Sequence, residues 1–449
     1  MDIYIKELKT TLDFKTIYSI FKNEKNTSFL DSSLKDKSIG RYSFIGLNPF
    51  LNFKGYQNTC IKNGDIYEGD IFKELNLILN KYKINNTTDI PFIGGGIGYF
   101  SYDLARNIEE IPSISKEDIN VPYCYFNFYD NIIIYDNIKD KIFITACGML
   151  KNKKESITLI EEKIHNFKIK KENHNYNSNS SFTSNFSKED YLESIKKVKD
   201  YIKDGDIYIT NLTQRFQTKV KEDPFLIYEK LRDINPAPFS AYLNFDDFKV
   251  ISSSPERFLK IEERKVQTRP IKGTRPRGCN KKEDQKNKDE LINSEKDKAE
   301  LLMIVDLERN DLSKVCKPYS VKVRELFKLE EYSTVFHLVS TIEGKLKDSV
   351  NSIDCIKECF PGGSITGAPK IRSMEIIDEI EKVRRNIYTG SIGYIGFEGN
   401  VDMNIVIRTI LIKEGIAYFG VGGGITSDSD IHMEYDETLD KAKALMRVL

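Results

Sequence analysis

The chain of 449 residues is 40% hydrophobic and 30% charged, and its 68 lysine and arginine residues balance 68 aspartate and glutamate residues. This length predicts a large hydrophobic core and two or three domains. A net charge of zero argues against nucleic acid or an anionic membrane surface as the partner, because either usually requires a basic face.

The beginning of the chain and its cysteines favour a cytoplasmic protein. The first residues, MDIYIKELKT, are charged and lack the apolar core of a signal peptide. No apolar run approaches membrane-spanning length. The seven cysteines are scattered without a CxxC pair, and there are only four histidines, so we do not expect a zinc site.

The first 150 residues alternate short strand-like runs, such as DNIIIYD and KIFITACG, with turns, and FKELNLILNKY has the pattern of an amphipathic helix. The segment KIKKENHNYNSNSSFTSN (168–185) is polar and rich in Asn and Ser, so we expect 151–187 to be a linker or exposed loop. A helix should follow, with Ser187 as its N-cap and Gly205 as its end.

Residues 188–449 form the second predicted region. Strand-like runs such as FKVISSS, VDMNIVIRTILI and IAYFGVGGG are interleaved with three predicted helices, EKDKAELLMIVDLERNDL, APKIRSMEIIDEIEKV and EYDETLDKAKALMRVL. Strands and helices do not alternate as regular βαβ units. The sequence therefore predicts an α+β fold with antiparallel sheets.

Four glycine-rich stretches could suggest phosphate binding: IGGGIGYF, PGGSITGAPK, YTGSIGYIG and GVGGGITSDSD. None matches GxxxxGK followed by Ser or Thr, and none places GxGxxG between a strand and a helix. We therefore do not predict a nucleotide site, although such loops can present amide donors to a carboxylate.

The stretch TRPIKGTRPRG (268–278) combines conformational restriction with positive charge. Two prolines fix φ, and Gly273 allows the backbone to approach a ligand closely. Lys272 stands in the middle. Such a turn suits an anionic small molecule, but taken alone it is more often a basic surface loop, as charge runs usually are.

Two predicted helices carry acidic residues three positions apart. Asp297 and Glu300 open one helix, and Glu434 and Glu437 open another. Residues at this spacing share a helix face, although acidic first turns usually complement the helix dipole. If the two helices face each other, their carboxylates would form a hard-cation site of the Mg²⁺ type, with Lys441 beside it.

Glu256, in SSSPERF, and His337, in STVFHLVS, are two further candidates. A carboxyl group at the end of a strand, as at Glu256, could serve as a general acid or make an ordinary ion pair. A lone histidine in an apolar run, as at His337, is more often a core residue than an acid or base.

The motifs SSSPERF, PIKGTRPRG, AELLMIVDLERNDL, FHLVSTIEG, FPGGSITGAPK, YTGSIGY, NIVIRT, GVGGGITSDSD and EYDETLDKA occur in this order. Their succession closely resembles the chorismate-utilising enzymes. The resemblance is dense over 188–449 and looser over 1–150, through FLDSS, GRYSFIG and GGGIGYFSYD. It implies large antiparallel sheets flanked by helices, with the N-terminal part packed on the C-terminal catalytic part.

The resemblance also implies roles for individual residues. Lys272 matches the nucleophile, Glu256 the general acid, and His337 a histidine near the substrate ring. Glu300 and Glu437 match Mg²⁺ ligands, with Asp297 and Glu434 as companions. Chorismate-contacting positions are matched by Gly273, Thr274, Tyr388, Arg408, Gly422, Gly423, Gly424 and Lys441. Four further residues match positions that line a tryptophan pocket in relatives: Ser32, Pro238, Phe239 and Ser240.

Within the family, PIKGT resembles the aminodeoxychorismate synthase branch, whereas anthranilate synthases read PIAGT. The tract GDIYITNLTQRF resembles the same branch, with Ile209 and Thr210 departing from its usual Gln and Val. No nucleophile elbow surrounds any cysteine, so ammonia should come from a separate glutaminase subunit. The alternatives are an anthranilate synthase component I and an inactive, tryptophan-binding paralogue.

Overall fold

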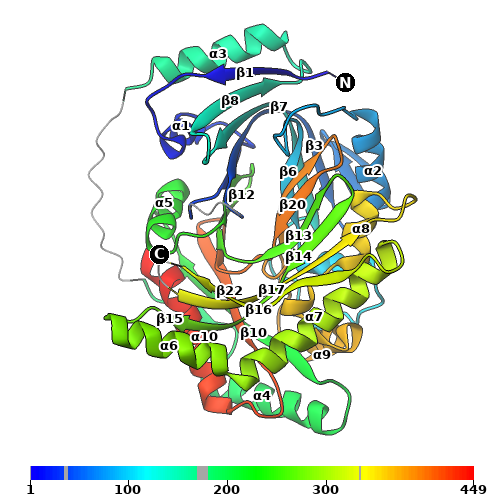
Figure 1. Cartoon of the computed structure of the whole chain (residues 1–449), viewed down its shortest axis with the longest axis vertical. Coiled ribbons are helices and arrows are strands. Elements are labelled where there is room, and N and C mark those ends of the chain that lie inside the picture. The colour runs from blue at the N-terminus through cyan, green and yellow to red at the C-terminus, as the bar shows by residue number, and fades with distance from the viewer. Residues whose placement is uncertain (1, 35–38, 169–179, 333–334) are drawn as a thin grey trace.

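Antiparallel strands dominate the structure, a computed structural model that describes residues 2–34, 39–168, 180–332 and 335–449 (Figure 1). Every ladder between its named strands is antiparallel, and the helices lie around them. This arrangement confirms the predicted α+β class. No helix in the described part of the chain is long and apolar enough to cross a membrane.

The helices are α1 (Phe14–Phe21), α2 (Ile71–Lys81), α3 (Lys153–His165), α4 (Lys188–Lys203), α5 (Pro224–Ile234), α6 (Lys281–Asn293), α7 (Glu295–Val315), α8 (Ser352–Cys359), α9 (Lys370–Ile380) and α10 (Ile431–Val448), with 3-10 turns η1 (Tyr102–Asn107) and η2 (Gly363–Ile365). The strands are β1 (Tyr4–Leu8), β2 (Ser28–Asp31), β3 (Tyr42–Gly55), β4 (Thr59–Lys62), β5 (Asp65–Glu68), β6 (Gly95–Phe100), β7 (Cys124–Asp136), β8 (Lys141–Ala146), β9 (Thr183–Ser184), β10 (Ile209–Lys219), β11 (Phe239–Asn244), β12 (Phe248–Ser254), β13 (Arg257–Glu262), β14 (Lys265–Arg269), β15 (Ile271–Pro276), β16 (Lys322–Glu331), β17 (Val335–Lys345), β18 (Gly367–Ala368), β19 (Ser391–Gly396), β20 (Val401–Asn404), β21 (Thr409–Lys413) and β22 (Ile416–Ile425).

The ladders form two arms that start from the paired strands β3 and β7. The first arm runs from β3 through β2, β11, β12, β21 and β22 to β10. The second runs from β7 through β6, β19, β20, β13 and β14 to β17, which also pairs with β15 and β16. The chain passes directly from one arm to the other between β12 and β13 and again between β20 and β21.

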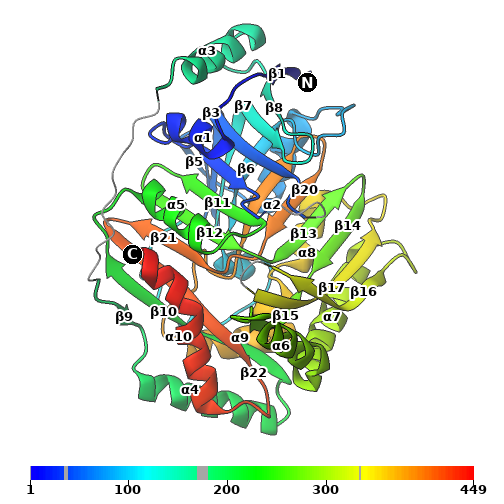
Figure 2. The same ribbon diagram turned by 60° about the vertical axis from the view of Figure 1, so that its left-hand side comes forward.

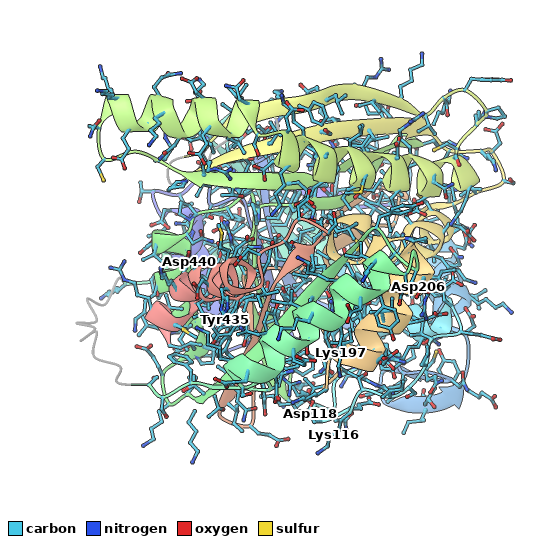
Figure 3. All side chains as sticks on the ribbon, turned by 90° about the horizontal axis from the view of Figure 1, so that it is seen from below. Lys116, Asp118, Lys197, Asp206, Tyr435 and Asp440 are labelled. Carbon is cyan, nitrogen blue, oxygen red and sulfur yellow. The ribbon has the colours of Figure 1, made fainter. Side chains whose placement is uncertain are left out.

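The predicted helices begin and end where their capping residues require. Ser187 Oγ accepts a hydrogen bond from the Asp190 amide, so α4 begins at Lys188, and Gly205, at a φ of +85°, lies just beyond its end. The other predicted helical segments correspond to α2, α7, α9 and α10. Seen from below, α4, which carries Lys197, lies beside α10, which carries Tyr435 (Figure 3).

The N-terminal region packs on the C-terminal region through strands and aromatic rings. The ring of Phe92 stacks on that of Tyr394 at 4.4 Å, and Phe44 meets the same tyrosine edge to face at 5.3 Å. Burying a side chain of this size contributes about 1.5–3 kcal/mol. Within the expected linker 151–187, Lys153–His165 form α3, because Ile157, Ile160 and Ile164 give it a buried apolar face. Residues 169–179 lie outside the described residues.

Candidate active site

Near the ends of the two arms, the motif strands β15 and β22 lie close together (Figure 2). A Cβ atom added to Gly424 on β22 would lie 3.4 Å from Lys272 Nζ on β15 and 3.1 Å from Ile209 Cδ1 on β10. The fold thus brings the PIKGT strand and the GVGGG strand to one place. A side chain at position 424 would press on Ile209 and touch the Lys272 amino group.

Glu256 and Arg408 lie in the β12–β13 and β20–β21 connections between the arms, respectively. The two connections are joined by backbone hydrogen bonds, from the Ile405 amide to the Glu256 carbonyl at 3.0 Å and from the Ser253 amide to the Arg408 carbonyl at 3.1 Å. The paired strands on either side of each connection therefore hold both residues in position.

Glu256 is 5% exposed, and the Ile271 amide donates a hydrogen bond to its Oε1 at 3.4 Å. Burial raises the pKa of Glu256, and this effect exceeds the opposing attraction of the nearby Lys272 ammonium group. A carboxyl group that keeps its proton above the usual range is suited to act as a general acid.

The first turns of α10 lie against β22. Glu434 is buried, and its Oε2 lies 3.3 Å from the position a Cβ of Gly423 would take, with Glu437 Oε1 at 3.7 Å. Lys441 Nζ contacts Glu437 Oε1 at 2.7 Å and donates to the Gly422 carbonyl at 2.8 Å. Burial would raise the pKa of Glu437, but the Lys441 ammonium group overrides it, so the pKa is lowered.

Glu300 on α7 joins this group through Lys296, whose Nζ lies 3.4 Å from Glu434 Oε1 and 3.9 Å from Glu300 Oε1. Burial raises the pKa of Glu300. The two acidic helix starts therefore face each other. The Asp297 carboxylate instead pairs with Arg275 on β15, which contacts its Oδ2 at 3.1 Å.

The oxygen atoms of these carboxylates are of the type that a hard cation takes, and a metal ion here stays a prediction. Carboxylate oxygens from two helices, together with ligand and water, are what Mg²⁺ usually takes. In the described part of the chain, no three His, Cys, Asp or Glu side chains converge closely enough to surround one ion. Lysine ammonium groups stand among the carboxylates instead. Glu300, Glu434 and Glu437 are the residues that would hold the metal.

Thr274, His337 and Arg408 form a second side of the site. Thr274 Oγ1 and His337 Nδ1 are 2.9 Å apart, and His337 Nε2 is buried with no hydrogen-bond partner among the described residues. Burial, assisted by the Arg408 charge, lowers the pKa of His337 to about 3, so the ring is neutral. Arg408 donates to Asn235 Oδ1 at 3.3 Å, and burial lowers its pKa.

The remaining residues that were predicted to contact substrate lie on or beside β22 and β15. Tyr388 covers β22 so closely that a Cβ on Gly420 would lie 2.3 Å from its ring, and burial raises the pKa of its phenol. A Cβ on Gly422 would lie 2.4 Å from the Leu212 carbonyl of β10. Gly273 has a φ of +77°, which favours glycine, and Asp297 lies beneath it.

Glu308 on α7 was not among the predicted site residues. It is buried, and Thr268 Oγ1 donates to its Oε2 at 2.8 Å. Burial raises the pKa of Glu308 to about 8, and the charges of Glu256 and Asp311 act in the same direction. Its spacing could have revealed it, because Leu301, Ile304, Val305, Glu308 and Leu312 form one stripe of α7.

A separate cavity of about 310 Å³ lies where β2, β11, β13 and β19 meet. Ser32, Pro238, Phe239 and Ser240 all line it, so the fold brings together the four residues of the expected tryptophan pocket. Ser32 Oγ donates to the Tyr42 carbonyl at 2.8 Å. That tryptophan binds here stays a prediction, which calorimetric titration with L-tryptophan would test.

Comparison with known proteins agrees with this geometry. A family described as chorismate binding enzyme matches residues 26–447. The chain is 39% identical to anthranilate synthase component 1 of Acetivibrio thermocellus, over 97% of this chain and 93% of the relative. It is also 39% identical to aminodeoxychorismate synthase component 1 of Bacillus subtilis (strain 168), over 91% of this chain and 89% of the relative. The crystal structure of anthranilate synthase component I from Streptococcus pneumoniae TIGR4 has a TM-score of 0.83 and 30% identity, covering 93% of this chain and 94% of that one.

The chain therefore belongs to the chorismate-binding enzyme family. It is an enzyme that uses chorismate, as the order of its motifs indicated.

Proposed function

We propose that the chain is an aminodeoxychorismate synthase component I, which converts chorismate and ammonia to 4-amino-4-deoxychorismate on the route to p-aminobenzoate and folate. The observation that carries this proposal is the position of Lys272, whose Nζ would lie 3.4 Å from a Cβ on Gly424. The positive charge of Lys272 also acts to lower the pKa of three carboxyl groups, those of Glu256, Glu300 and Glu437. A primary amine at the centre of the site can act as a nucleophile.

In this proposal Lys272 first loses its ammonium proton to solvent, and the neutral amine attacks C2 of chorismate. Both ring double bonds shift, and the C4 hydroxyl leaves as water with the proton of Glu256. Ammonia then adds at C4 and the lysine amine leaves C2, so the enolpyruvyl group is retained. A proton from the incoming ammonia restores the acid form of Glu256.

Positively charged groups would bind and orient the substrate. Arg408 can bind a carboxylate through two parallel hydrogen bonds, and Lys441 provides a point charge beside Gly422. The neutral His337 ring offers an unpaired Nε2. Mg²⁺, held by Glu300, Glu434 and Glu437, would neutralise the ring carboxylate and polarise the ring toward substitution.

Ammonia would come from a separate glutaminase subunit. None of the seven cysteines, of which only Cys279 is exposed, lies in a nucleophile elbow. We expect the purified chain to form product from ammonium salts and not from glutamine. Glutamine-dependent product without a second polypeptide would contradict this expectation.

Anthranilate synthase component I is the second candidate, because relatives with that name are as similar as those named aminodeoxychorismate synthase. The decisive experiment is mass analysis of the products formed from chorismate, Mg²⁺ and ammonium. The proposal expects 4-amino-4-deoxychorismate. Anthranilate as the main product would refute it.

Lys272→Ala tests the role of the lysine directly. Removing the amine opens C2 to ammonia, so the variant should lose most 4-amino product and form some 2-amino-2-deoxyisochorismate. The carboxylates and Arg408 are unchanged, so the loss should appear mainly in kcat. A variant that makes the 4-amino product at the wild-type rate would show that Lys272 is not the nucleophile.

A further inference from the structure

Lys296 occupies the space between the two acidic helix starts. It lies on α7 one turn before Glu300, and its ammonium group reaches Glu434 on α10 as well. Its distances to these carboxylates are 3.9 Å and 3.4 Å. One ammonium group thus serves as counter-ion to a carboxylate from each helix.

The carboxylates need such a counter-ion because they are largely withdrawn from water. The side chain of Glu300 is 13% exposed and that of Glu434 is 6% exposed. Ser429 Oγ donates to Glu434 Oε1 at 2.7 Å, but a hydroxyl group supplies no net charge. Lys441 is engaged with Glu437 and the Gly422 carbonyl. The charge of Lys272 also acts on Glu300, but Lys296 is the cation within ion-pair distance of both Glu300 and Glu434 among the described residues.

The same ammonium group is poorly anchored. The side chain of Lys296 is 51% exposed, and its two contacts are long beside the 2.7 Å contact of Lys441 with Glu437. A lysine stem is flexible, so the charged tip can move into solvent while the helix stays in place. Removing it from the carboxylates should require little energy, because partly exposed ion pairs are weak.

We propose that Lys296 is a displaceable counter-ion that holds the Glu300 and Glu434 carboxylates in the absence of metal and competes with Mg²⁺ for them. Mg²⁺ binds carboxylate oxygens at about 2.0–2.1 Å, so an ion on the oxygens that Lys296 contacts would strongly repel its ammonium group. The lysine must leave as the ion enters. This inference rests on the proposed magnesium site and not on the identity of the amino product.

The test is calorimetric titration of MgCl2 into the metal-free full-length chain without chorismate. Lys296→Met removes the competing charge and keeps a flexible apolar stem. Its Kd for Mg²⁺ should be lower than that of wild type by about three- to tenfold, the range expected for one or two partly exposed ion pairs. Lys296→Arg keeps the charge, so its Kd should stay within about twofold of wild type.

Lys298→Met is the matched control. Lys298 lies on the same helix, but its Nζ pairs with Glu295 at 3.2 Å, away from the site. Its loss changes the net charge equally and should leave the Kd for Mg²⁺ within about twofold of wild type. An equal gain in both methionine variants would mean that only overall charge matters, and would overturn the proposal.

Two other results would also overturn it. Unchanged or weaker Mg²⁺ binding by Lys296→Met would show that the lysine does not compete, while the magnesium site itself stands if wild type binds the ion. If neither wild type nor Lys296→Met binds Mg²⁺, the proposed metal site is refuted as well. Neither result depends on product analysis, so the identity of the enzyme is tested separately.

Discussion

The buried carboxyl group of Glu308 should make the stability of the protein depend on pH. Its pKa is raised from the usual 4.5 to about 8, chiefly by burial. The folded state therefore binds this proton more tightly than the unfolded state. The resulting stabilisation is fully present below pH 4.5 and is lost as the pH rises through 8.

The size of the effect follows from the shift. Each pKa unit corresponds to about 1.4 kcal/mol, so ionising Glu308 should reduce the free energy of unfolding by about 5 kcal/mol in total. Roughly 3 kcal/mol of this loss should fall between about pH 6 and pH 9, because the unfolded chain has already lost this proton while the folded state keeps it up to about pH 8.

Glu308→Gln isolates this contribution, because glutamine has nearly the same shape, cannot ionise and still offers an oxygen to Thr268. The free energy of unfolding, measured by urea denaturation from pH 6 to pH 9, should fall for wild type relative to the variant by roughly 3 kcal/mol. Glu295→Gln is the control on the same helix. The Glu295 side chain is 88% exposed, so its replacement should change stability by no more than about 0.5 kcal/mol at any pH.

A constant difference between wild type and Glu308→Gln across this pH range would refute the reasoning. It would mean that the carboxylate is charged throughout and is compensated in the folded state. Lys370 is the cation on which such compensation would depend, because it contacts Asp311 one turn away on α7 and its charge already acts on Glu308.

Two further predictions concern catalysis. Glu300→Gln or Glu437→Gln should abolish turnover at ordinary Mg²⁺ concentrations, because each removes an anionic ligand from a divalent site; full activity in both would refute the metal assignment. Glu256→Gln should lose most of kcat, and the wild-type rate should fall as the pH rises through the raised pKa of Glu256; a pH profile without that decline would argue against an acid role.

Local rules placed the helices that were predicted, although α1, α3, α5, α6 and α8 were not among them. Ser187 and Gly205 marked the ends of α4, and the helices that carry the acidic pairs were correctly predicted as α7 and α10. The pairing of β6 with β19 could not be predicted in the same way. It joins residues almost 300 positions apart, and neither strand has a pattern that specifies its partner.

For the site, too, some features could be predicted from the sequence and others could not. The motif order indicated which residues belong together, and the spacing of Asp297 and Glu300 indicated a shared helix face. Spacing could not reveal that Arg275 draws Asp297 away or that Lys296 stands between the helices, because both depend on what the neighbouring elements present. Glu308 was missed because an acidic residue in an apolar stripe is normally assigned to the surface.

The pairing of β6 with β19 has a consequence for the synthesis of the chain. The strand Gly95–Phe100 emerges from the ribosome early, and one of its edges stays unpaired until Ser391–Gly396 has been made. At about 5–20 residues per second, that wait lasts roughly 15–60 s. During this interval the nascent chain presents an open, glycine-rich strand edge, which is a surface that other chains can join. Its yield in a cell should therefore depend on translation speed and on chaperones that cover strand edges.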